Sequence, residues 1–319
     1  MVPTRLIVDT DTAGDDVNSL LIALLHPAIR LEAVTISVGN VGFEQQIENA
    51  LYTIEMAGRS GEVPVYPGCA EPLLQRWVAA DYVHGREGMG DSFFPKARQR
   101  PESRHAVDAL IERVQAEPGR ISILAQAPLT NIAAAVIRDP SIATRVERLY
   151  IMGGTYFAPG NITPAAEYNF YVDPEAAAIV FNAGFPIRLV DWGVCVRDGV
   201  LGDADLAEIE ALGTELSRFY LAVNRLVRRF NESVGIPGVT HPDSIVAAMI
   251  ADPDIALGWR RCHVDIETRG ELTRGASVIL PESHAGVERR DVARFNAEVC
   301  LGVDTARFKA LLLEILSRR

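Results

Sequence analysis

The first part of the chain alternates short apolar runs with longer amphipathic patterns. RLIVDT (5–10) and LEAVTISVG (31–39) are rich in β-branched residues and have the length of strands. The segments that follow them, DDVNSLLIALLHP (15–27) and FEQQIENALYTIEMAG (43–58), have the apolar spacing of helices that end at a proline and at a glycine. The pattern therefore predicts strand and helix in alternation.

The same alternation continues to about residue 190. A helix pattern precedes a strand pattern at 106–119 and 120–127, at 129–140 and 146–154, and at 173–184 and 186–192. This order predicts an α/β fold: a mostly parallel central sheet flanked by helices on both faces, a Rossmann-like open sheet.

The last third of the chain changes in character. Residues 203–233 predict one or two amphipathic helices, and HPDSIVAAMIADP (241–253) predicts another. The tail from residue 262 predicts a hairpin and one more strand, and 305–319 a closing helix. Because we find no linker, internal repeat or low-complexity tract, we expect a single domain over 1–319. The long glycine-rich segment 75–104 is a candidate flap.

Composition narrows the classes of partner. The chain has 319 residues, of which 48% are hydrophobic and 23% charged, the ordinary balance of a globular protein. Its net charge of −11 argues against binding to nucleic acid or to an anionic membrane surface. The four cysteines form no CxxC pair, and neither a signal peptide nor a membrane-spanning run is visible. We therefore expect a cytoplasmic protein without a zinc site.

Polar residues follow the predicted strands. In a parallel sheet the carboxyl ends of the strands meet at one edge, where ligands bind. The polar strand ends are Asp9 and Asp11, Gly39-Asn40, 126–130, Gly153-Gly154 and Asp191-Trp192. These residues are the first candidates for a site.

DTDTAGDD (9–16) places four aspartates, Asp9, Asp11, Asp15 and Asp16, within eight positions. Capping of the next helix explains one or two of them, because acidic groups stabilise a helix N-terminus by about 0.3–1 kcal/mol. It does not easily explain four, since neighbouring carboxylates near a sheet edge repel one another. A bound cation removes that repulsion, and oxygen ligands without Cys or His favour Ca²⁺ or Mg²⁺.

A phosphotransferase is a further hypothesis for the same segment. IVDTDT (7–12) is similar to the DxDxT nucleophile motif of the haloacid-dehalogenase type. That type also needs a lysine, and only Lys96 and Lys309 occur, neither of them after a predicted sheet strand. This hypothesis is therefore weaker.

Residues 9–20 also resemble the DxDxGxDDAxAL signature of the nucleoside hydrolases, the purine- or pyrimidine-nucleoside N-ribohydrolases. The chain departs from it at Thr12-Ala13, where Pro-Gly is usual, and at Asn18, where a small residue is usual. Further blocks resemble the family in the right order: VGN (38–40), HGREGMGD (84–91), APLTNIAAA (127–135), the diagnostic 152–177, HPDSIVAA (241–248) and FNAEVCLGVDTARF (295–308). The chain is thus identified as a member of this family, similar to the inosine-uridine preferring enzymes, and a nucleoside hydrolase fold is expected.

The resemblance implies a Ca²⁺ site and a hydrolytic water. Asp11, Asp16, Asp243 and the main-chain carbonyl of Thr130 would bind the ion. Asp11 would also act as general base, and Asn40 would support the region of the ion and the water. The implied reaction cleaves the N-glycosidic bond of a ribonucleoside and gives free base and ribose.

The resemblance also implies which residues hold the sugar. Asp15 would bind the 2′-hydroxyl and Asn169 the 3′-hydroxyl, while Asn161 and Glu167 would bind the 5′-hydroxyl. A protein with this pocket could also bind Ca²⁺ and ribose or nucleoside without turnover, and an intact Asp11 disfavours that alternative. Relatives form dimers or tetramers, so a homodimer or homotetramer is expected.

The residues expected near the leaving base are less regular. His241 is the candidate acid, and His84 is expected to contact the base from the flap. Trp192 is a candidate to stack on the base, and a packing aromatic is an equally good interpretation of it. The chain reads His241-Pro242-Asp243 where many members have His directly before Asp, so the resemblance leaves the acid role of His241 open. The base preference stays open at this point.

Overall fold

The computed structural model describes residues 2–284 and 295–318, which contain a nine-stranded sheet. All neighbouring strands pair in parallel, except that β9 runs antiparallel to both β10 and β11. The predicted fold class and the predicted C-terminal hairpin and strand are confirmed. In spatial order the strands are β10 (Ser277–Pro281), β9 (Trp259–Ile266), β11 (Ala297–Cys300), β6 (Ile187–Val190), β5 (Arg148–Met152), β4 (Ile121–Ala125), β1 (Thr4–Thr10), β2 (Ile29–Ile36) and β3 (Val65–Pro67).

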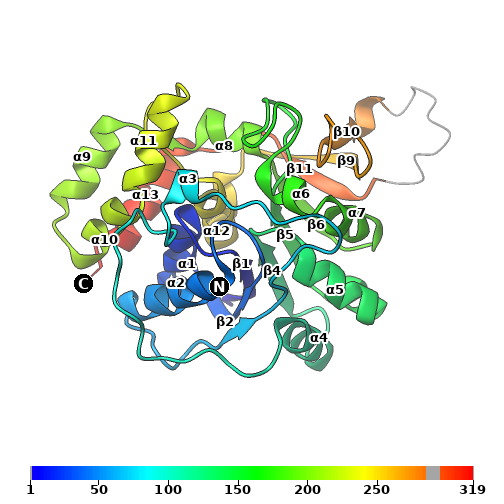
Figure 1. The fold of residues 1–319 in the computed structure, drawn as a ribbon, viewed down its shortest axis with the longest axis horizontal. Coiled ribbons are helices and arrows are strands. Elements are labelled where there is room, and N and C mark those ends of the chain that lie inside the picture. The colour runs from blue at the N-terminus through cyan, green and yellow to red at the C-terminus, as the bar shows by residue number, and fades with distance from the viewer. Residues whose placement is uncertain (1, 285–294, 319) are drawn as a thin grey trace.

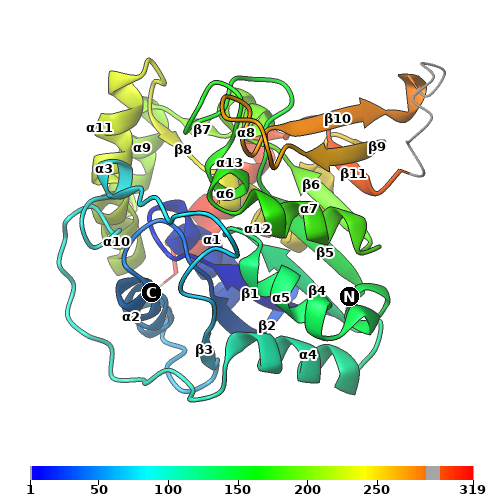
Figure 2. The same cartoon turned by 45° about the vertical axis from the view of Figure 1, so that its right-hand side comes forward.

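Helices cover both faces of this sheet (Figures 1 and 2). In β1, Leu6 and Val8 pack into one apolar core and Ile7 into the other, because successive side chains of a strand point to opposite faces. A strand buried on both faces reads as a continuous apolar run, which is why RLIV was legible in the sequence. The first core is closed by α1 (Asp15–Leu25), α2 (Phe43–Met56), α12 (Pro242–Ala251) and α13 (Thr305–Leu316), and the second by α4 (Ala106–Ala116), α5 (Thr130–Arg138) and α7 (Pro174–Asn182).

The remaining elements gather beyond the carboxyl ends of the strands or connect the layers. None of the helices within 2–284 and 295–318 is long and apolar enough to cross a membrane. The elements are α3 (Asp81–His84), α6 (Tyr168–Val172), α8 (Trp192–Asp198), α9 (Asp203–Ala211), α10 (Glu215–Val223), α11 (Arg225–Ser233), the hairpin β7 (Val200–Leu201) with β8 (Val239–Thr240), and the 3₁₀ turns Pro140–Thr144, Pro253–Ile255 and Glu282–His284.

Residues 203–233 form three helices, α9, α10 and α11, where one or two were expected. Gly213, at φ +60°, lies between α9 and α10 and turns the chain there. The Thr214 side chain then caps α10 by accepting a hydrogen bond from the Ser217 N–H. The chain breaks again at Asn224 between α10 and α11. The helical periodicity of the segment is right, but its interruptions were missed.

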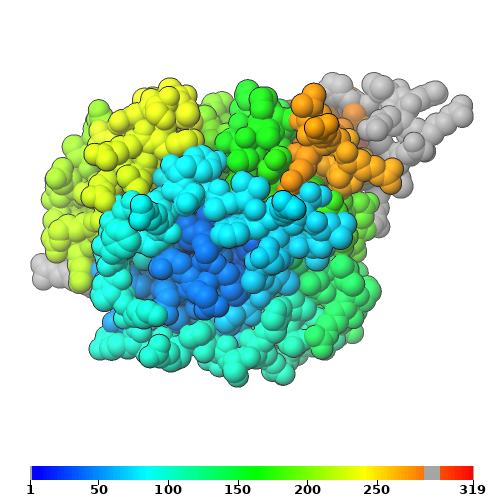
Figure 3. All heavy atoms as spheres, in the orientation of Figure 1, coloured from blue at the N-terminus to red at the C-terminus, as the bar shows by residue number. Residues whose placement is uncertain are grey.

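The segment that joins β3 to α4 wraps around one side of the molecule (Figures 1 and 3). It contains α3, and its Glu87 carboxylate accepts hydrogen bonds from the N–H groups of Met89, Ser92 and Phe93. The mobility expected of a flap there stays a prediction.

The sheet order reverses at the pair β1 and β4. The chain runs from β1 outward to β2 and β3, and then returns to β4 on the other side of β1. At such a reversal the connections leave in opposite directions and open a crevice beyond the strand ends. The Gln126 N–H donates to the Asp9 carbonyl at 2.9 Å, so the two strand ends are held side by side there. The acidic segment 9–16 therefore begins at the crevice.

The turn from β1 into α1 depends on Gly14. Its φ is +48°, a left-handed conformation that favours glycine, and a Cβ there would overlap Nδ1 of His84. The Gly14 N–H also donates to the Gly88 carbonyl at 2.8 Å. Gly14 thus lets the segment after α3 lie directly on the aspartate motif.

Asp9 lies behind the site and is fully buried. Its Oδ1 accepts hydrogen bonds from Thr35 Oγ1 at 2.6 Å and from Asn131 Nδ2 at 2.8 Å, whereas its Oδ2 has no partner within the described chain. Burial raises the pKa of Asp9 to about 7. Asp9 therefore links β1, β2 and α5, in line with a structural role.

We expect Gly14→Ala to lower the free energy of unfolding by about 1–3 kcal/mol, the cost of a left-handed non-glycine residue, with a further loss from the overlap with His84. Urea unfolding measures the change. Gly42→Ala is the matched control, since a Cβ at Gly42 has no atom within 4 Å. Equal losses in the two variants would contradict this reason.

We expect Asp9→Asn to stabilise the protein increasingly as the pH rises. The unfolded carboxyl ionises near its ordinary pKa of 3.8, and the folded one only near 7, so the wild type loses stability between these values. The variant has no such proton, and its advantage should grow by up to about 4 kcal/mol from pH 4 to pH 8. Unfolding free energies of both proteins against pH test this, and a constant difference would contradict it.

Candidate active site

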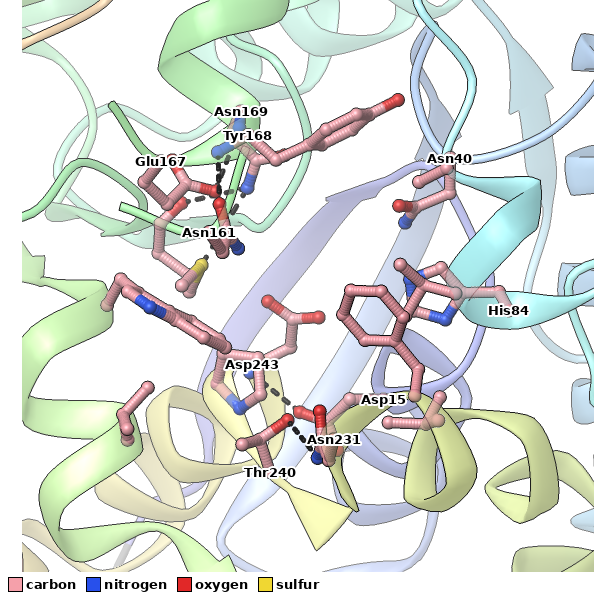
Figure 4. A pocket seen from close by; sticks show the side chains of 18 of the residues that line it. Asp15, Asn40, His84, Asn161, Glu167, Tyr168, Asn169, Asn231, Thr240 and Asp243 are labelled. Atoms are coloured by element: carbon pink, nitrogen blue, oxygen red, sulfur yellow. Dashed lines mark hydrogen bonds between the residues drawn. The ribbon is translucent and has the colours of Figure 1, made fainter. Parts of the chain in front are cut away.

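A cavity of about 450 Å³ lies at the crevice, within the range of about 300–1,000 Å³ typical of small-molecule sites. Figure 4 shows labelled side chains converging on it from several elements. Asn161 and Glu167 come from the segment that leads into α6, Asn169 from α6 itself, and His84 from α3. Asp15 and Asp243 come from the first turns of α1 and α12. Segments far apart in sequence thus form one pocket.

The floor of this cavity consists of the buried carboxylates of Asp15, Asp16 and Asp243. Asp11 lies next to Asp16 but does not itself line the cavity. Asp16 lines the cavity, and its carboxylate accepts hydrogen bonds from Thr10 Oγ1 (2.6 Å) and Gln126 Nε2 (3.0 Å). Asp11 is fully buried, and its Oδ2 accepts a hydrogen bond from the Asn40 N–H at 2.9 Å. These donors fix both carboxylates on the ends of β1 and α1.

Glycine permits this approach. A Cβ at Gly39 would overlap the Asp11 carboxylate, so the chain after β2 can pass this close only without a side chain. Asn40, the next residue, also donates from its Nδ2 to Asp16 at 3.3 Å. The expected place of Asn40 beside the aspartates is therefore found.

Asp15 and Asp243 stand together at the N-terminus of α12. The Asp15 Oδ2 accepts hydrogen bonds from the N–H groups of Asp243 (2.7 Å) and Ser244 (2.9 Å). The Asp15 Oδ1 accepts from Ser244 Oγ and from Asn18 Nδ2. The N-terminus of a helix favours a carboxylate, so α12 holds Asp15 from outside its own helix.

The carboxylates of Asp11, Asp16 and Asp243 are buried close together, so the ionised form of each is unfavourable. Burial raises the pKa of Asp16 to about 6. Burial, followed by the charge of Asp16, raises the pKa values of Asp11 and Asp243 well above the ordinary value. In the described chain, Oδ1 of Asp11 and Oδ1 of Asp243 are enclosed and have no hydrogen-bond partner. Both features are typical of a place that a cation completes.

The oxygen atoms of these carboxylates are ligands that suit a hard cation, but the side chains do not lie in a coordination shell around a single point. Among residues 2–284 and 295–318 there is no ready-made group of three or more His, Cys, Asp or Glu side chains that could hold a metal ion. The candidates that the site offers are the carboxylates of Asp11, Asp16 and Asp243. They would have to draw together to bind an ion.

The opposite wall carries the residues expected to hold the sugar. Glu167 caps α6 by accepting hydrogen bonds from the Asn169 N–H (2.8 Å) and the Phe170 N–H (3.3 Å), and burial raises its pKa to about 7. Asn161 Oδ1 accepts from the Tyr168 N–H at 2.8 Å. All three residues, Asn161, Glu167 and Asn169, line the cavity, as predicted.

The outer part of the cavity is largely apolar. His84 and Trp192 line it as expected. Nδ1 of His84 is enclosed without a hydrogen-bond partner in the described chain, and burial lowers the pKa of His84 to about 4, so the ring is neutral at pH 7. Sequence reasoning missed the rest of this wall, because no motif marks it: Tyr82, Val83, Val196, Val227, Phe230, Asn231, Val234 and Ile236.

The structure corrects the role predicted for His241. The ring is fully buried outside the cavity lining, with Nε2 at 2.7 Å from the Tyr220 hydroxyl and Nδ1 at 3.1 Å from the Gly199 carbonyl. Burial also lowers its pKa. Because both ring nitrogens are engaged in the core, His241 is not placed to protonate a base in the pocket. Asp243, which follows Pro242 in the first turn of α12, lines the cavity, whereas His241 does not.

The structure also corrects the predicted role of Thr130. This residue starts α5, donates from Oγ1 to Asp173 at 2.7 Å, and does not line the cavity. Gln126, four residues earlier, lines the cavity and contacts Asp16, and its carbonyl accepts a hydrogen bond from Asn169 Nδ2 at 3.3 Å. Gln126 follows β4 directly, so its place at the end of a strand is the signal that could have identified it in place of Thr130.

Comparisons with known proteins agree with this geometry. A sequence model of the family described as inosine-uridine preferring nucleoside hydrolase matches residues 6–310. Uridine nucleosidase 1 of Arabidopsis thaliana is 36% identical over 83% of this chain and 79% of that protein. The inosine-uridine preferring nucleoside hydrolase of Leishmania major is 34% identical over 99% of this chain and 98% of that protein. A solved plant nucleoside hydrolase has a TM-score of 0.92 and 30% identity, covering 99% of this chain and 100% of that chain.

These likenesses confirm the fold and the family that the motifs predicted. The family match extends over almost the whole chain and thereby removes the basis of the haloacid-dehalogenase hypothesis. The chain belongs to the inosine-uridine preferring nucleoside hydrolase family, a family of nucleoside N-ribohydrolases.

Proposed function

We propose that the protein hydrolyses the N-glycosidic bond of ribonucleosides and releases free base and ribose. The observation that carries this proposal is a single cavity with a floor of buried carboxylates and an apolar outer wall. The hydroxyl-rich sugar matches the floor, and the flat base matches the wall. Relatives named for uridine and inosine make these two nucleosides the first substrates to test.

In this proposal Asp11 is the general base. Its Oδ1 is the carboxylate oxygen that no donor of the described chain engages, so it is free to accept a proton from water. Its Oδ2 stays fixed by the Asn40 N–H, which holds the carboxylate in one orientation. Asp15 binds the 2′-hydroxyl, Asn169 the 3′-hydroxyl, and Asn161 with Glu167 the 5′-hydroxyl.

The family depends in general on a metal ion, and we propose Ca²⁺ for this chain. Asp11, Asp16 and Asp243 would hold it, with the carbonyl of Gln126 in place of the one first expected from Thr130. When bound, the ion would lower the pKa of a water and orient the sugar hydroxyls. The unpartnered oxygens of Asp11 and Asp243 support this proposal.

The carboxylate floor would also stabilise the transition state. Cleavage of a glycosidic bond builds positive charge on the sugar, and fixed negative groups beneath the ring stabilise that charge. On the base side, neutral His84 would donate or accept one hydrogen bond, and Trp192 would pack against the ring. The expected homodimer or homotetramer and the cytoplasmic location stay predictions.

Replacement of Asp11 by Asn should lower kcat for ribose release from uridine or inosine by about 100-fold or more, the contribution of a positioned general base. The amide keeps the size and the acceptor for Asn40 but loses the basic oxygen. Released ribose is measured with a reducing-sugar assay. Asp254→Asn, at an exposed ion pair with Arg307, is the matched control and should keep wild-type turnover.

Unchanged turnover in Asp11→Asn would contradict its role as base. If the wild type releases no ribose from any nucleoside but binds one, the non-catalytic binding function replaces the proposed one.

Addition of Ca²⁺ to chelator-treated protein should raise its melting temperature. Binding to the folded state alone stabilises by about 2.7 kcal/mol at a concentration 100 times Kd. Asp243→Asn should abolish this shift, because it removes a ligand and its unpartnered oxygen. Asp9→Asn should retain it, since Asp9 contacts Thr35 and Asn131 behind the site.

A larger shift with Mg²⁺ than with Ca²⁺ would contradict the choice of ion. No shift with either would contradict the cation site.

A further inference from the structure

Asn18 is the one residue of the aspartate motif that both departs from the family signature and contacts a proposed substrate-binding group. It lies on α1, one turn after Asp15, and is fully buried. Its Nδ2 donates to Asp15 Oδ1 at 3.2 Å and to Asn224 Oδ1 at 3.4 Å. A small side chain, the usual choice at this position, would make neither bond.

The buried side chain of Asn18 also makes an unfavourable contribution to the stability of the folded state. The Asn18 Oδ1 is enclosed and has no hydrogen-bond partner in the described chain. A buried acceptor without a partner destabilises the folded state, so stability alone gives no reason for an amide here. A group retained in spite of such a cost is often one that a functional site needs.

Asn18 completes the set of donors that fix Asp15. The other donors, the N–H groups of Asp243 and Ser244 and the Ser244 hydroxyl, all come from α12. Asn18 is the donor that reaches Asp15 from its own helix, on the side of Asn224. Without Asn18, Oδ1 of Asp15 would accept a hydrogen bond only from Ser244 of α12 within the described chain.

Asn224 connects this contact to the wall of the cavity. It is buried at the junction of α10 and α11, and its Nδ2 donates to the Tyr220 carbonyl at 2.8 Å. The helix that begins there, α11, contributes Val227 and Phe230 to the apolar wall. A chain of hydrogen bonds thus joins the wall to the carboxylate on the floor.

We propose that Asn18 is a positioning residue that orients Asp15 toward the sugar and strengthens the preference for ribonucleosides over 2′-deoxyribonucleosides. Asn224 anchors Asn18 and thereby ties Asp15 to α11. The inference rests on the proposed function, because it takes Asp15 as the partner of the 2′-hydroxyl. It concerns the 2′ position alone, so its effect is absent when the substrate has no hydroxyl there.

The test compares kcat/KM for uridine and 2′-deoxyuridine in the wild type and in Asn18→Ala, with Ca²⁺ present. The variant should lose about tenfold with uridine and less than about twofold with 2′-deoxyuridine, the size expected for one charge-assisted hydrogen bond. The ratio of the two values therefore falls about five- to tenfold. Asn182→Ala is the matched control, since Asn182 is exposed and bonds only to the Ala178 carbonyl of its own helix.

The anchor is tested with Asn224→Ala and the double variant. If Asn18 acts through Asn224, the double variant should lower the ratio no further than Asn18→Ala does, because the two residues form one chain of contacts. Independent, additive losses would overturn the role of Asn224. Thermal melting checks folding, and Asn18→Ser replaces Asn18→Ala if the latter unfolds.

Three outcomes would overturn the inference. Equal losses with both nucleosides would mean that Asn18 is structural only, and no loss with either nucleoside would mean that it does not position Asp15. If the wild type is active on uridine and Asn18→Ala gives either of these two results, this inference is overturned and the proposed function stands. A wild type that releases ribose from no nucleoside overturns both.

Discussion

The structure depends on burying several carboxylates side by side at the point where the sheet order reverses. Asp11, Asp16 and Asp243 are removed from water, and each raises the cost of ionising another. The fold meets this cost with donors: side chains on strand ends, the amide of Asn40, and the N-terminus of α12. These donors leave two oxygens unengaged in the described chain, so the cluster is stable enough to form yet chemically incomplete. A site of this kind is suited to bind a cation and to accept a proton.

The close approach of chain segments follows from two glycines. At Gly39 the chain passes against the Asp11 carboxylate, and at Gly14 it lies against His84. Any other residue would push β2 or α3 away from the end of β1 and widen the crevice. The position of the flap-side histidine is thus set by backbone geometry in the aspartate motif. Nothing in the structure explains the departure at Thr12-Ala13: Asn49 Nδ2 donates to the Thr12 carbonyl at 2.9 Å, a contact that any residue there could accept.

The two halves of the pocket have different origins. The floor comes from strand ends and helix starts, which the sheet places together by its topology. The outer wall comes from α3, α8 and α11, which lie beyond the carboxyl ends of the strands (Figures 1 and 4). The proposed sugar contacts therefore come mainly from the ends of sheet strands and the starts of helices, whereas the proposed base contacts come from helices outside the sheet. The hydrogen bonds of Asn18 cross from one half to the other.

The sequence by itself determined the order of strands and helices, the parallel sheet and the family, because period and motif are local properties of the chain. It also located Asp15, Asp16 and Asn40 at one edge, since strand ends and helix starts are legible locally, whereas Glu167 and Asp243 came from the resemblance to the family. Only the tertiary structure decided which way side chains turn and what lies opposite them. His241 is buried against Tyr220 although its neighbour Asp243 faces the cavity, and Gln126 lies where Thr130 was expected. Partners such as Asn18 and Asn224 are 206 positions apart, and no local pattern encodes a contact that packing alone creates.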